Sequence, residues 1–363
     1  MKTRILLGLL LCILALSASA ADMTASLKPG KAELKSASAL AFGPDGVLFI
    51  GDAMGASIVA VDTGDRTPAT AGALNVTGLS EKIAAMLGTT PDQILINDMS
   101  VNPISRKAYL SVSRGKGPDA VPVIMRVSPA GKIEELSLDA VKFSSTSLSN
   151  AAADQKDARG MNKRMQAITD IAYIDGRVFV AGLSNEEFSS NLRAIPFPFK
   201  EAGPGTSVEI WHGSHGRFET NSPIRTFVAY KIKEQQHILA AYTCTPLVAF
   251  NVDDLKPGTK VMGKTIAELG NRNNPLDMIV YHKDGKDYIL LNNSSRGVMK
   301  VTADHLENYE GIKEPIKEKA GVPYETIDSW KGVQHLDRFD DTNALLLMRS
   351  EGGSLDLKTV ALP

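Results

Sequence analysis

The chain has 363 residues, with 40 lysines and arginines against 41 aspartates and glutamates, and 43% of its residues are hydrophobic. This composition is ordinary for a soluble globular protein and excludes a disordered or collagen-like chain. The nearly neutral charge balance also argues against nucleic-acid binding through a global basic surface.

Residues 1–20 have the pattern of a secretory signal peptide. Lys2 and Arg4 give a basic start, an apolar run extends from Ile5 to Leu16, and small residues lead to Ala18-Ser19-Ala20. The run is too short to span a bilayer, and no later segment is long and apolar enough to do so. The sequence therefore predicts cleavage after Ala20, no membrane span, and a single mature domain over residues 21–363 that is periplasmic or secreted.

The cysteine content is consistent with a domain held together by its core. After the predicted cleavage Cys244 is the remaining cysteine, so no intramolecular disulfide can form. A chain of this length can bury a large hydrophobic core, and stability must come from that core.

A unit of strand, tight turn, strand, polar loop and strand recurs along the chain. It first occurs at Ser38–Phe42, followed by the turn Pro44-Asp45-Gly46 and by apolar runs at 47–50 and 57–61. Asp-Gly between alternating apolar runs favours a β-hairpin, because glycine adopts positive φ without a steric cost. Five further units are predicted to begin at Asp98, Asp170, Thr226, Asp277 and His335.

Two insertions interrupt these units. Residues 79–88 have apolar side chains at helical spacing and end in glycine, which predicts a short amphipathic helix over one end of the blades. Residues 144–164 are rich in Ser, Ala, Asn and Asp, which predicts a mobile loop.

Six repeated units fill residues 21–363 and predict an all-β protein, a six-bladed β-propeller of four-stranded antiparallel blades. Seven blades are the alternative, if residues 137–168 or 302–332 hold a degenerate blade. A β-sandwich suits such regular hairpin units less well. The pattern, with its phrase Phe42-Gly43-Pro44-Asp45-Gly46, resembles the six-bladed propellers of the NHL, TolB and SMP-30/gluconolactonase-like group. Many propellers share that phrase, so it fixes no activity.

Propeller geometry turns the repeat into a candidate site. The first strand of each blade lines the central channel, so residues at the first-strand starts meet at one mouth. Four of them have metal-ligand chemistry: Asp98, Asp170, Asp277 and His335. Carboxylate oxygens suit Ca, Mg or Mn, and the imidazole favours a transition metal, so a divalent metal ion is the predicted cofactor. The alternative is that each aspartate caps a turn of its own backbone.

The loops that join second to third strands fall on the same face in this arrangement. They and their flanks carry candidate ligand-binding residues, namely Asn185, Glu186, Arg193, Cys244, Asn292, Asn293, Arg296 and Arg349. Binding residues are often carried on loops of a rigid scaffold, although surface loops are polar in general.

The phrase Trp211–Thr220 adds His212, His215 and Glu219 to this face. Two histidines three residues apart can bind one metal, whereas the alternative is a glycine-rich turn with solvent-facing histidines. Cys244 is either a soft ligand or nucleophile, or a buried inert side chain. The chain has no C-x-x-C-H, P-loop or dinucleotide fingerprint, which predicts no haem and no nucleotide.

Three functions are compatible with these features. The first is an exported propeller that binds a small ligand, a metal ion or a partner protein's loop at the polar mouth of its channel. The second, implied by the resemblance to SMP-30-like propellers, is a metal-dependent hydrolase or lactonase. The third is a protein-interaction scaffold, and the fold alone does not choose between enzyme and binding protein.

Overall fold

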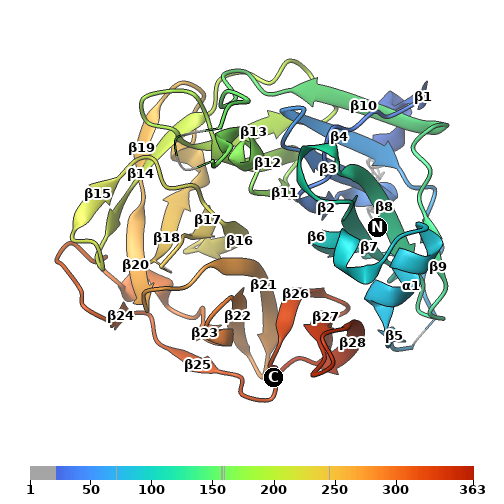
Figure 1. Ribbon diagram of the computed structural model, residues 1–363. Coiled ribbons are helices and arrows are strands. Elements are labelled where there is room, and N and C mark those ends of the chain that lie inside the picture. Colours follow the sequence, from blue (N-terminus) through green and yellow to red (C-terminus); the bar gives the residue numbers. More distant parts are fainter. Residues whose placement is uncertain (1–21, 71, 157, 159, 245) are drawn as a thin grey trace, which may run out of the picture.

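The computed structural model describes residues 22–363 except 71, 157, 159 and 245, so the predicted signal peptide lies outside the described residues. Over this part of the chain the strands form six sheets, which are the blades of a propeller around a central channel (Figure 1). The predicted all-β, six-bladed propeller of four-stranded antiparallel blades is confirmed, and extra outer strands widen some blades. In the same described part, no helix is long and apolar enough to cross a membrane.

The blades are numbered here by the order of their innermost strands in the chain. From the channel outwards, blade 1 contains β2 (Leu40–Phe42), β3 (Val47–Asp52), β4 (Ser57–Asp62), β10 (Val141–Ser147) and β1 (Lys28–Gly30). Blade 2 contains β6 (Ile94–Val101), β7 (Ala108–Arg114), β8 (Val121–Val127) and β9 (Ile133–Glu135). Blade 3 contains β11 (Asp170–Ile174), β12 (Arg177–Leu183), β13 (Ser190–Pro196), β14 (Thr206–His212) and β15 (Arg217–Glu219), and β19 (Lys260–Met262) pairs in parallel with β14.

In the same order, blade 4 contains β16 (Thr226–Ile232), β17 (Gln235–Ala241), β18 (Pro246–Asn251), β20 (Lys264–Leu269) and β24 (Lys319–Gly321). Blade 5 contains β21 (Pro275–Lys283), β22 (Lys286–Asn293), β23 (Gly297–Thr302) and β25 (Tyr324–Thr326). Blade 6 contains β26 (Val333–Arg338), β27 (Asn343–Arg349), β28 (Leu355–Ala361) and β5 (Asn75–Val76). One α-helix, α1 (Leu79–Met86), and short 3₁₀ turns complete the described chain.

The blades do not follow one another around the ring in chain order. The innermost strands contact their neighbours in the cyclic order β6, β2, β11, β16, β21 and β26, and β26 returns to β6 (Figure 1). The ring therefore runs through blades 2, 1, 3, 4, 5 and 6. After blade 2 the chain passes back over blade 1, where it adds the outer strand β10, before it begins blade 3.

The ring is closed by a strand from the first part of the chain. β5 lies between blades 1 and 2 in sequence, yet it pairs with β28 at the outer edge of blade 6. Blade 6 thus combines strands from both ends of the described chain, and separating blades 2 and 6 requires breaking this sheet.

The Asp-Gly turn predicted at Pro44-Asp45-Gly46 forms, and Asp-Gly pairs in two further repeat units make the same kind of turn. Asp45, Asp175 and Asp284 have φ of 57°, 46° and 52°, and the glycine that follows each of them also has a positive φ. Two consecutive residues with positive φ define the type I′ turn, whose twist matches that of the strands it joins.

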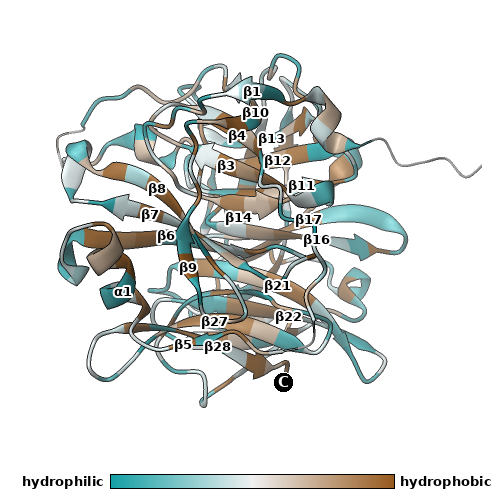
Figure 2. Cartoon of the chain, turned by 90° about the vertical axis from the view of Figure 1, so that its right-hand side faces the viewer, coloured by the Kyte–Doolittle hydropathy of each residue, from teal (hydrophilic) through white to brown (hydrophobic). Residues whose placement is uncertain are grey.

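The hydrophobic core lies between the blades, where neighbouring sheets face each other. Figure 2 shows the strands rich in hydrophobic residues and many of the loops around them hydrophilic. The predicted helix at 79–88 is present as α1, which buries Leu79 and Ile83 against residues of blades 2 and 6 such as Val112 and Leu347. The helix therefore covers the joint at which β5 closes the ring.

The two stretches that left room for a seventh blade supply outer strands instead. Residues 141–147 form β10 of blade 1, so the loop predicted over 144–164 begins four residues too early. Residues 302–332 contain β24 and β25, which extend blades 4 and 5. Both segments pair with existing sheets, so the described residues contain six blades.

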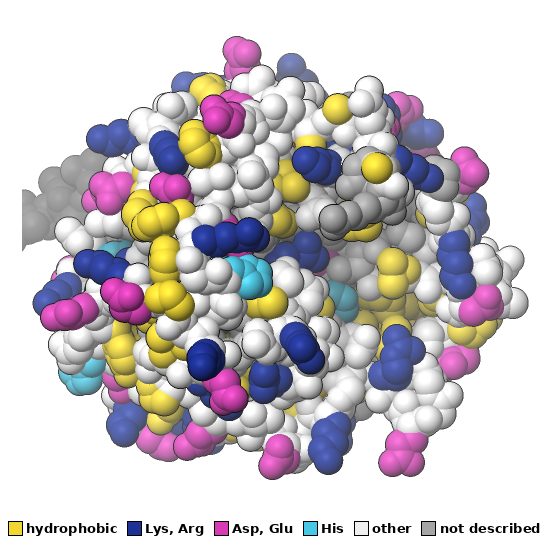
Figure 3. All heavy atoms as spheres, turned by 60° about the vertical axis from the view of Figure 1, so that its left-hand side comes forward, with side chains coloured by type: hydrophobic (Ala, Val, Ile, Leu, Met, Phe, Trp, Pro, Cys, Tyr) yellow, Lys and Arg dark blue, Asp and Glu magenta, His cyan; other side chains and the backbone are white. Residues whose placement is uncertain are grey.

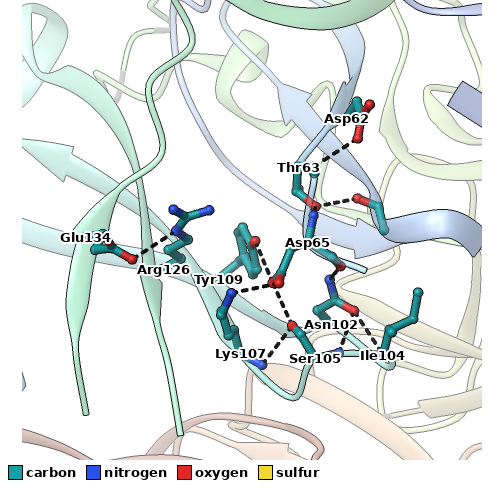
Figure 4. A network of polar contacts seen from close by, with 12 residues as sticks. Asp62, Thr63, Asp65, Asn102, Ile104, Ser105, Lys107, Tyr109, Arg126 and Glu134 are labelled. Atoms are coloured by element: carbon teal, nitrogen blue, oxygen red, sulfur yellow. Dashed lines mark hydrogen bonds and ion pairs between the residues drawn. The ribbon is translucent and has the colours of Figure 1, made fainter. Parts of the chain in front are cut away.

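A buried polar network joins blades 1 and 2 (Figure 4). Asp65, in the segment after β4, accepts hydrogen bonds from Lys107 Nζ at 2.7 Å and from Ser105 Oγ at 2.6 Å. Tyr109 OH donates to the same carboxylate at 3.0 Å. Burial raises the pKa of Asp65, but hydrogen bonds from Lys107 and Ser105 outweigh this and hold the pKa below its usual range.

Candidate functional site

The four residues predicted to bind metal all reach the central channel. Asp98, Asp170 and Asp277 line both of two adjoining cavities, of about 580 and 250 Å³, and His335 lines the smaller one. Asp98, Asp277 and His335 converge, with ligand atoms within 4.8 Å of one another. Asp170 lies in the same channel but outside this group of three.

A β-bulge accompanies each of the three converging residues. The pairing register shifts between Ile96 and Asp98 in β6, between Pro275 and Met278 in β21, and between Val333 and His335 in β26. The innermost strands of blades 1, 3 and 4 pair without such a shift. A bulge adds a residue to one strand and re-aims the side chains beside it. The three bulged strands belong to neighbouring blades, so the bulges direct one side chain from each blade to a shared point.

The channel aspartates also bind the backbone of the next blade. Asp98 Oδ2 accepts the Leu40 N–H at 2.6 Å, Asp170 Oδ2 accepts the Phe227 N–H at 2.8 Å, and Asp277 Oδ2 accepts the Leu336 N–H at 3.0 Å. Each bond reaches forward in the same sense around the ring. Asp98 and Asp170 also accept the N–H of the following residue in their own strand, which differs from the turn cap that the alternative predicted.

Sequence reasoning missed Asp337, which repeats this bond from blade 6 to blade 2. Its Oδ2 accepts the Val101 N–H at 2.7 Å, and the residue lines the larger channel cavity. Asp337 follows His335 by two positions, and side chains two apart on a strand share a face. The alternation of side chains along this strand was therefore the sequence signal that could have placed Asp337 in the channel.

His335 provides the positive charge of this cluster. Its Nδ1 lies 3.2 Å from Asp277 Oδ2 and 3.8 Å from Asp98 Oδ1. Burial lowers the pKa of His335, but Asp277 and Asp98 outweigh this and raise the pKa to about 9. The imidazole is therefore an imidazolium at neutral pH when the cluster holds no other cation.

The carboxylates exceed what one imidazolium neutralises. Burial, together with the charge of Asp277, raises the pKa of Asp98 well above its usual range. Burial likewise raises the pKa of Asp170 to about 7 and that of Asp337 to about 6. These carboxylates are partly buried and their pKa values are raised, so a cation bound beside them would favour their charged form.

The histidine phrase and Cys244 form a second convergent group. His212, His215 and Cys244 have ligand atoms within 4.8 Å of one another, and Glu219 contacts both histidines. None of these residues lines either channel cavity. Sequence reasoning missed their buried neighbour Glu268 on β20, because it is distant in sequence and carries no motif.

The predicted ligand residues on β13 and β22 are engaged within the fold. The Arg193 guanidinium is buried and donates to the carbonyls of Ser149 at 2.6 Å and Gly203 at 3.1 Å. Asn292 Nδ2 donates to the Val333 carbonyl at 3.2 Å, and Asn293 Oδ1 accepts the Arg296 N–H at 2.7 Å. These side chains fasten loops and neighbouring blades in the present geometry.

The remaining predicted ligand residues lie towards the periphery. Asn185 is exposed, and Glu186 accepts a hydrogen bond from Asn150 Nδ2 at 3.0 Å. The Arg296 guanidinium donates to the Asn271 carbonyl at 3.3 Å. Arg349 lines a peripheral cavity of about 560 Å³ that also reaches His335. The structure thus spreads the predicted ligand set over several blades and does not gather it at one point.

Charged side chains of both signs are interspersed on the side that carries β14, β15 and β20 (Figure 3). A nucleic-acid interface needs a continuous basic surface. The side shown has no such surface.

No protein-family model and no curated protein sequence matches the chain. Its resemblance to the NHL, TolB and SMP-30-like group therefore stays a prediction. Solved structures with a related shape include a PQQ-bound aldose sugar dehydrogenase from Streptomyces coelicolor, at 11% identity over 92% of this chain and 96% of that one, with a TM-score of 0.35. A glucose dehydrogenase-type oxidoreductase from Thermus thermophilus shares 12% identity over 92% of this chain and 100% of that one, with a TM-score of 0.38.

An engineered GH43 glycoside hydrolase with xylanase and arabinofuranosidase activity is a third similar structure. It shares 11% identity over 80% of this chain and 52% of that one, with a TM-score of 0.39, so this chain spans about half its length. At these identities and scores, the three likenesses carry no argument about activity, cofactor or partner.

Proposed function

We propose that this protein is an exported propeller that binds a divalent cation in its central channel, through Asp98, Asp277 and His335. The observation that carries this proposal is the convergence of their ligand atoms within 4.8 Å, each on a strand with a β-bulge at that point. Three neighbouring blades each depart from regular pairing to contribute one ligand-type side chain.

The charge of the channel supports the same conclusion. The two channel cavities are lined by Asp98, Asp170, Asp277 and Asp337 together with His335, Arg106, Arg225 and Arg338. His335 is the cationic side chain that contacts Asp98 and Asp277. A divalent ion in place of the His335 proton adds one further positive charge at this point. Buried charges in proteins are paired or coordinate a metal, and a divalent ion meets that need here.

The donor set indicates which ions fit. Two carboxylates are hard oxygen ligands suited to Ca, Mg and Mn, and the imidazole extends the range to transition metals. The mouth cavity of about 250 Å³ beside the three ligands includes the polar side chains of Asn97, Gln166 and Arg225. A small polar ligand that enters this cavity would contact the proposed ion. The cation site would then also bind the ligand.

The same cavity favours the second candidate function, a metal-dependent hydrolase or lactonase. A bound divalent ion there would polarise the carbonyl of a small ester or lactone. Screening such substrates with the cation-loaded protein separates this activity from simple binding, and the Asp277→Asn variant described next is the control for it.

The test of the cation site is a Mn²⁺ titration followed by electron paramagnetic resonance and calorimetry. Mn²⁺ prefers oxygen and imidazole ligands to thiolates, so it reports on the channel. We expect about one equivalent bound to the wild type, and affinity at least about tenfold weaker in Asp277→Asn, because even indirect ligand contacts are worth that much. The amide oxygen still accepts the Leu336 N–H, so the fold is retained.

Asp175→Asn is the matched control, because Asp175 lies in a surface turn with φ of 46°, which asparagine tolerates. Its Mn²⁺ affinity should equal that of the wild type. Equal affinity in Asp277→Asn and Asp175→Asn, or no binding by the wild type at millimolar Mn²⁺, would refute the channel site.

A further inference from the structure

A second group of ligand-type side chains lies away from the channel, where blades 3 and 4 meet. His212 ends β14, His215 lies in the tight turn that follows, and Glu219 ends β15. Cys244 is in the loop between β17 and β18 of blade 4. The turn and that loop bring three donor types together: two imidazoles, a thiol and a carboxylate.

The Glu219 carboxylate contacts the Nδ1 atom of each of the two histidines. It lies 3.0 Å from His212 Nδ1 and 2.7 Å from His215 Nδ1, and the Ser222 hydroxyl donates to it at 2.7 Å. Each Nδ1 is hydrogen-bonded to this carboxylate, so Nε2 is the ring nitrogen of each histidine that is left to bind a ligand.

The Nε2 side of the pair is poised to bind a ligand. The two rings have centroids 3.9 Å apart with an angle of 34° between their planes, so both Nε2 atoms face away from Glu219. His212 is 1% exposed, and its Nε2 is buried with no hydrogen-bond partner in the described structure. A buried polar atom without a partner destabilises the fold, and a bound ligand would remove that cost.

Cys244 completes the group. Its ligand atom and those of the two histidines lie within 4.8 Å of one another. Its backbone has φ of 65°, a conformation that costs a non-glycine residue energy, and its N–H donates to the Asn273 carbonyl at 2.7 Å. The loop is therefore fixed in a strained conformation that brings the thiol to the histidines.

We propose that His212, His215 and Cys244 bind a thiophilic transition-metal ion, zinc or copper, through the two Nε2 atoms and the Cys244 thiolate. A carboxylate that accepts the Nδ1 proton of a ligating histidine is a recurring support of such sites, since it fixes the ring and raises its basicity. A mixed imidazole and thiolate donor set suits zinc and copper better than calcium, magnesium or manganese. This site is distinct from the proposed channel site in both its residues and its metal preference.

Glu268 adds a buried carboxyl group beside the proposed ion. Its Oε1 accepts the Gly213 N–H at 2.6 Å, and its Oε2 is buried without a hydrogen-bond partner in the described structure. Gly213 also permits this approach, because a Cβ there would lie 3.0 Å from Glu268 Oε1. A cation held by the two histidines would supply the positive partner that the buried carboxylate lacks.

Access to the site is through His215, whose side chain is 41% exposed, whereas that of His212 is 2% exposed. An ion can therefore enter from solvent and be held by the buried His212 and the half-buried Cys244. An open coordination position remains after three protein ligands, which suits either a bound water or a ligand exchanged with a partner.

The first test is a Co²⁺ titration, because a cobalt–thiolate bond gives charge-transfer absorption that oxygen and nitrogen ligands do not. We expect one equivalent with this band in the wild type and no such band in Cys244→Ser. Glu219→Gln should bind about 10- to 100-fold more weakly. His237→Gln, which changes a half-buried histidine on β17 that lies outside this group, is the matched control and should bind as the wild type does.

The second test needs no variant that could fail to fold. Alkylation of Cys244 by iodoacetamide should become at least tenfold slower when Zn²⁺ or Cu⁺ is added, and competition with chelators of known affinity then ranks the two ions. An alkylation rate unchanged by both ions, or a wild-type cobalt spectrum without the thiolate band, would overturn the proposal. Loss of Mn²⁺ binding in Asp277→Asn would leave it unaffected.

Discussion

Buried carboxylates in this protein are stabilised in two different ways. Asp65 has a lysine ammonium and two hydroxyl donors, and its pKa is below the usual range despite burial. Asp98 has backbone N–H donors, a neighbouring carboxylate and a His335 imidazolium that it shares with Asp277, and burial and the charge of Asp277 raise its pKa. The first arrangement satisfies a charge within the fold, so Asp65 is a structural residue. The second leaves a charge to be satisfied, which is why we assign ligand binding to the channel.

This contrast predicts a pH-dependent stability effect at Asp65. Replacing Asp65 with Asn should lower the free energy of unfolding at pH 7 by about 2–4 kcal/mol, because Lys107 loses its buried partner but is partly exposed. The Asp65 pKa is depressed in the folded state, so its contribution is present above the unfolded pKa of about 4 and is lost as the pH falls through the folded value. The difference between variant and wild type should therefore shrink below about pH 4.

Urea unfolding at pH 7 and at pH 3.5 measures this difference. Asp341→Asn serves as control, because the Asp341 side chain is 91% exposed and its ion pair with Arg338 is worth little. A deficit for Asp65→Asn that is the same at both pH values would show that packing, not charge, causes it.

At the scale of single elements, the local sequence predicts the hairpin turns and the helix but does not predict the β-bulges. Asp45-Gly46 and its counterparts determine the hairpins, because the turn chemistry is contained in two adjacent residues. The periodicity of residues 79–88 likewise identifies α1. The bulges at Asp98, Asp277 and His335 carry no sequence signal, since they depend on the register with a partner strand. The channel residues were predictable from their strand positions, whereas their convergence was not.

Another element-scale feature is the close approach of a backbone segment to β12. A Cβ added at Gly182 would lie 2.1 Å from the Ala167 carbonyl oxygen, and Ala167 follows the turn with Met165 and Gln166 that lines the channel mouth. Gly182→Ala should therefore displace this turn and lower the free energy of unfolding by about 1–3 kcal/mol. Gly203→Ala is the matched control, because its added Cβ meets nothing within 4 Å and its effect should stay within about 0.5 kcal/mol.

Urea unfolding of both glycine variants provides the comparison, and the Mn²⁺ titration shows whether the mouth has changed. Equal stability of Gly182→Ala and Gly203→Ala would mean that the turn adjusts without cost. In that case the turn at 163–167 would not be fixed by its contact with β12.

At the scale of the whole molecule, the order of the blades around the ring cannot be predicted from the sequence pattern. Six hairpin units indicate how many blades exist, but each unit has the same local pattern and none specifies its neighbours. The exchange of blades 1 and 2 depends on two outer strands, β10 and the two-residue β5, which are too short or too polar to be recognised alone. Ring order is a property of long-range packing, and it decides which channel residues become neighbours.

The joint between β5 and β28 is the place where this ring order can be tested. Thr359 Oγ1 accepts the Leu74 N–H at 2.8 Å and also lies 3.0 Å from the Leu74 carbonyl, so one hydroxyl links residues 285 positions apart. Thr359→Val keeps the side-chain shape but leaves both backbone groups without this partner. We expect the free energy of unfolding to fall by about 1–3 kcal/mol.

Hydrogen exchange locates the effect of this substitution. If the joint closes the ring, the amides of Leu74 and Gly78 should lose protection in Thr359→Val, since the Gly78 N–H is bonded to Asp356 Oδ1 in the same joint at 2.8 Å. Thr302→Val, at the exposed end of β23, is the control and should change neither protection nor stability beyond about 0.5 kcal/mol. Unchanged exchange at Leu74 would show that the core between blades 2 and 6, with α1 over it, closes the ring without the strand pairing.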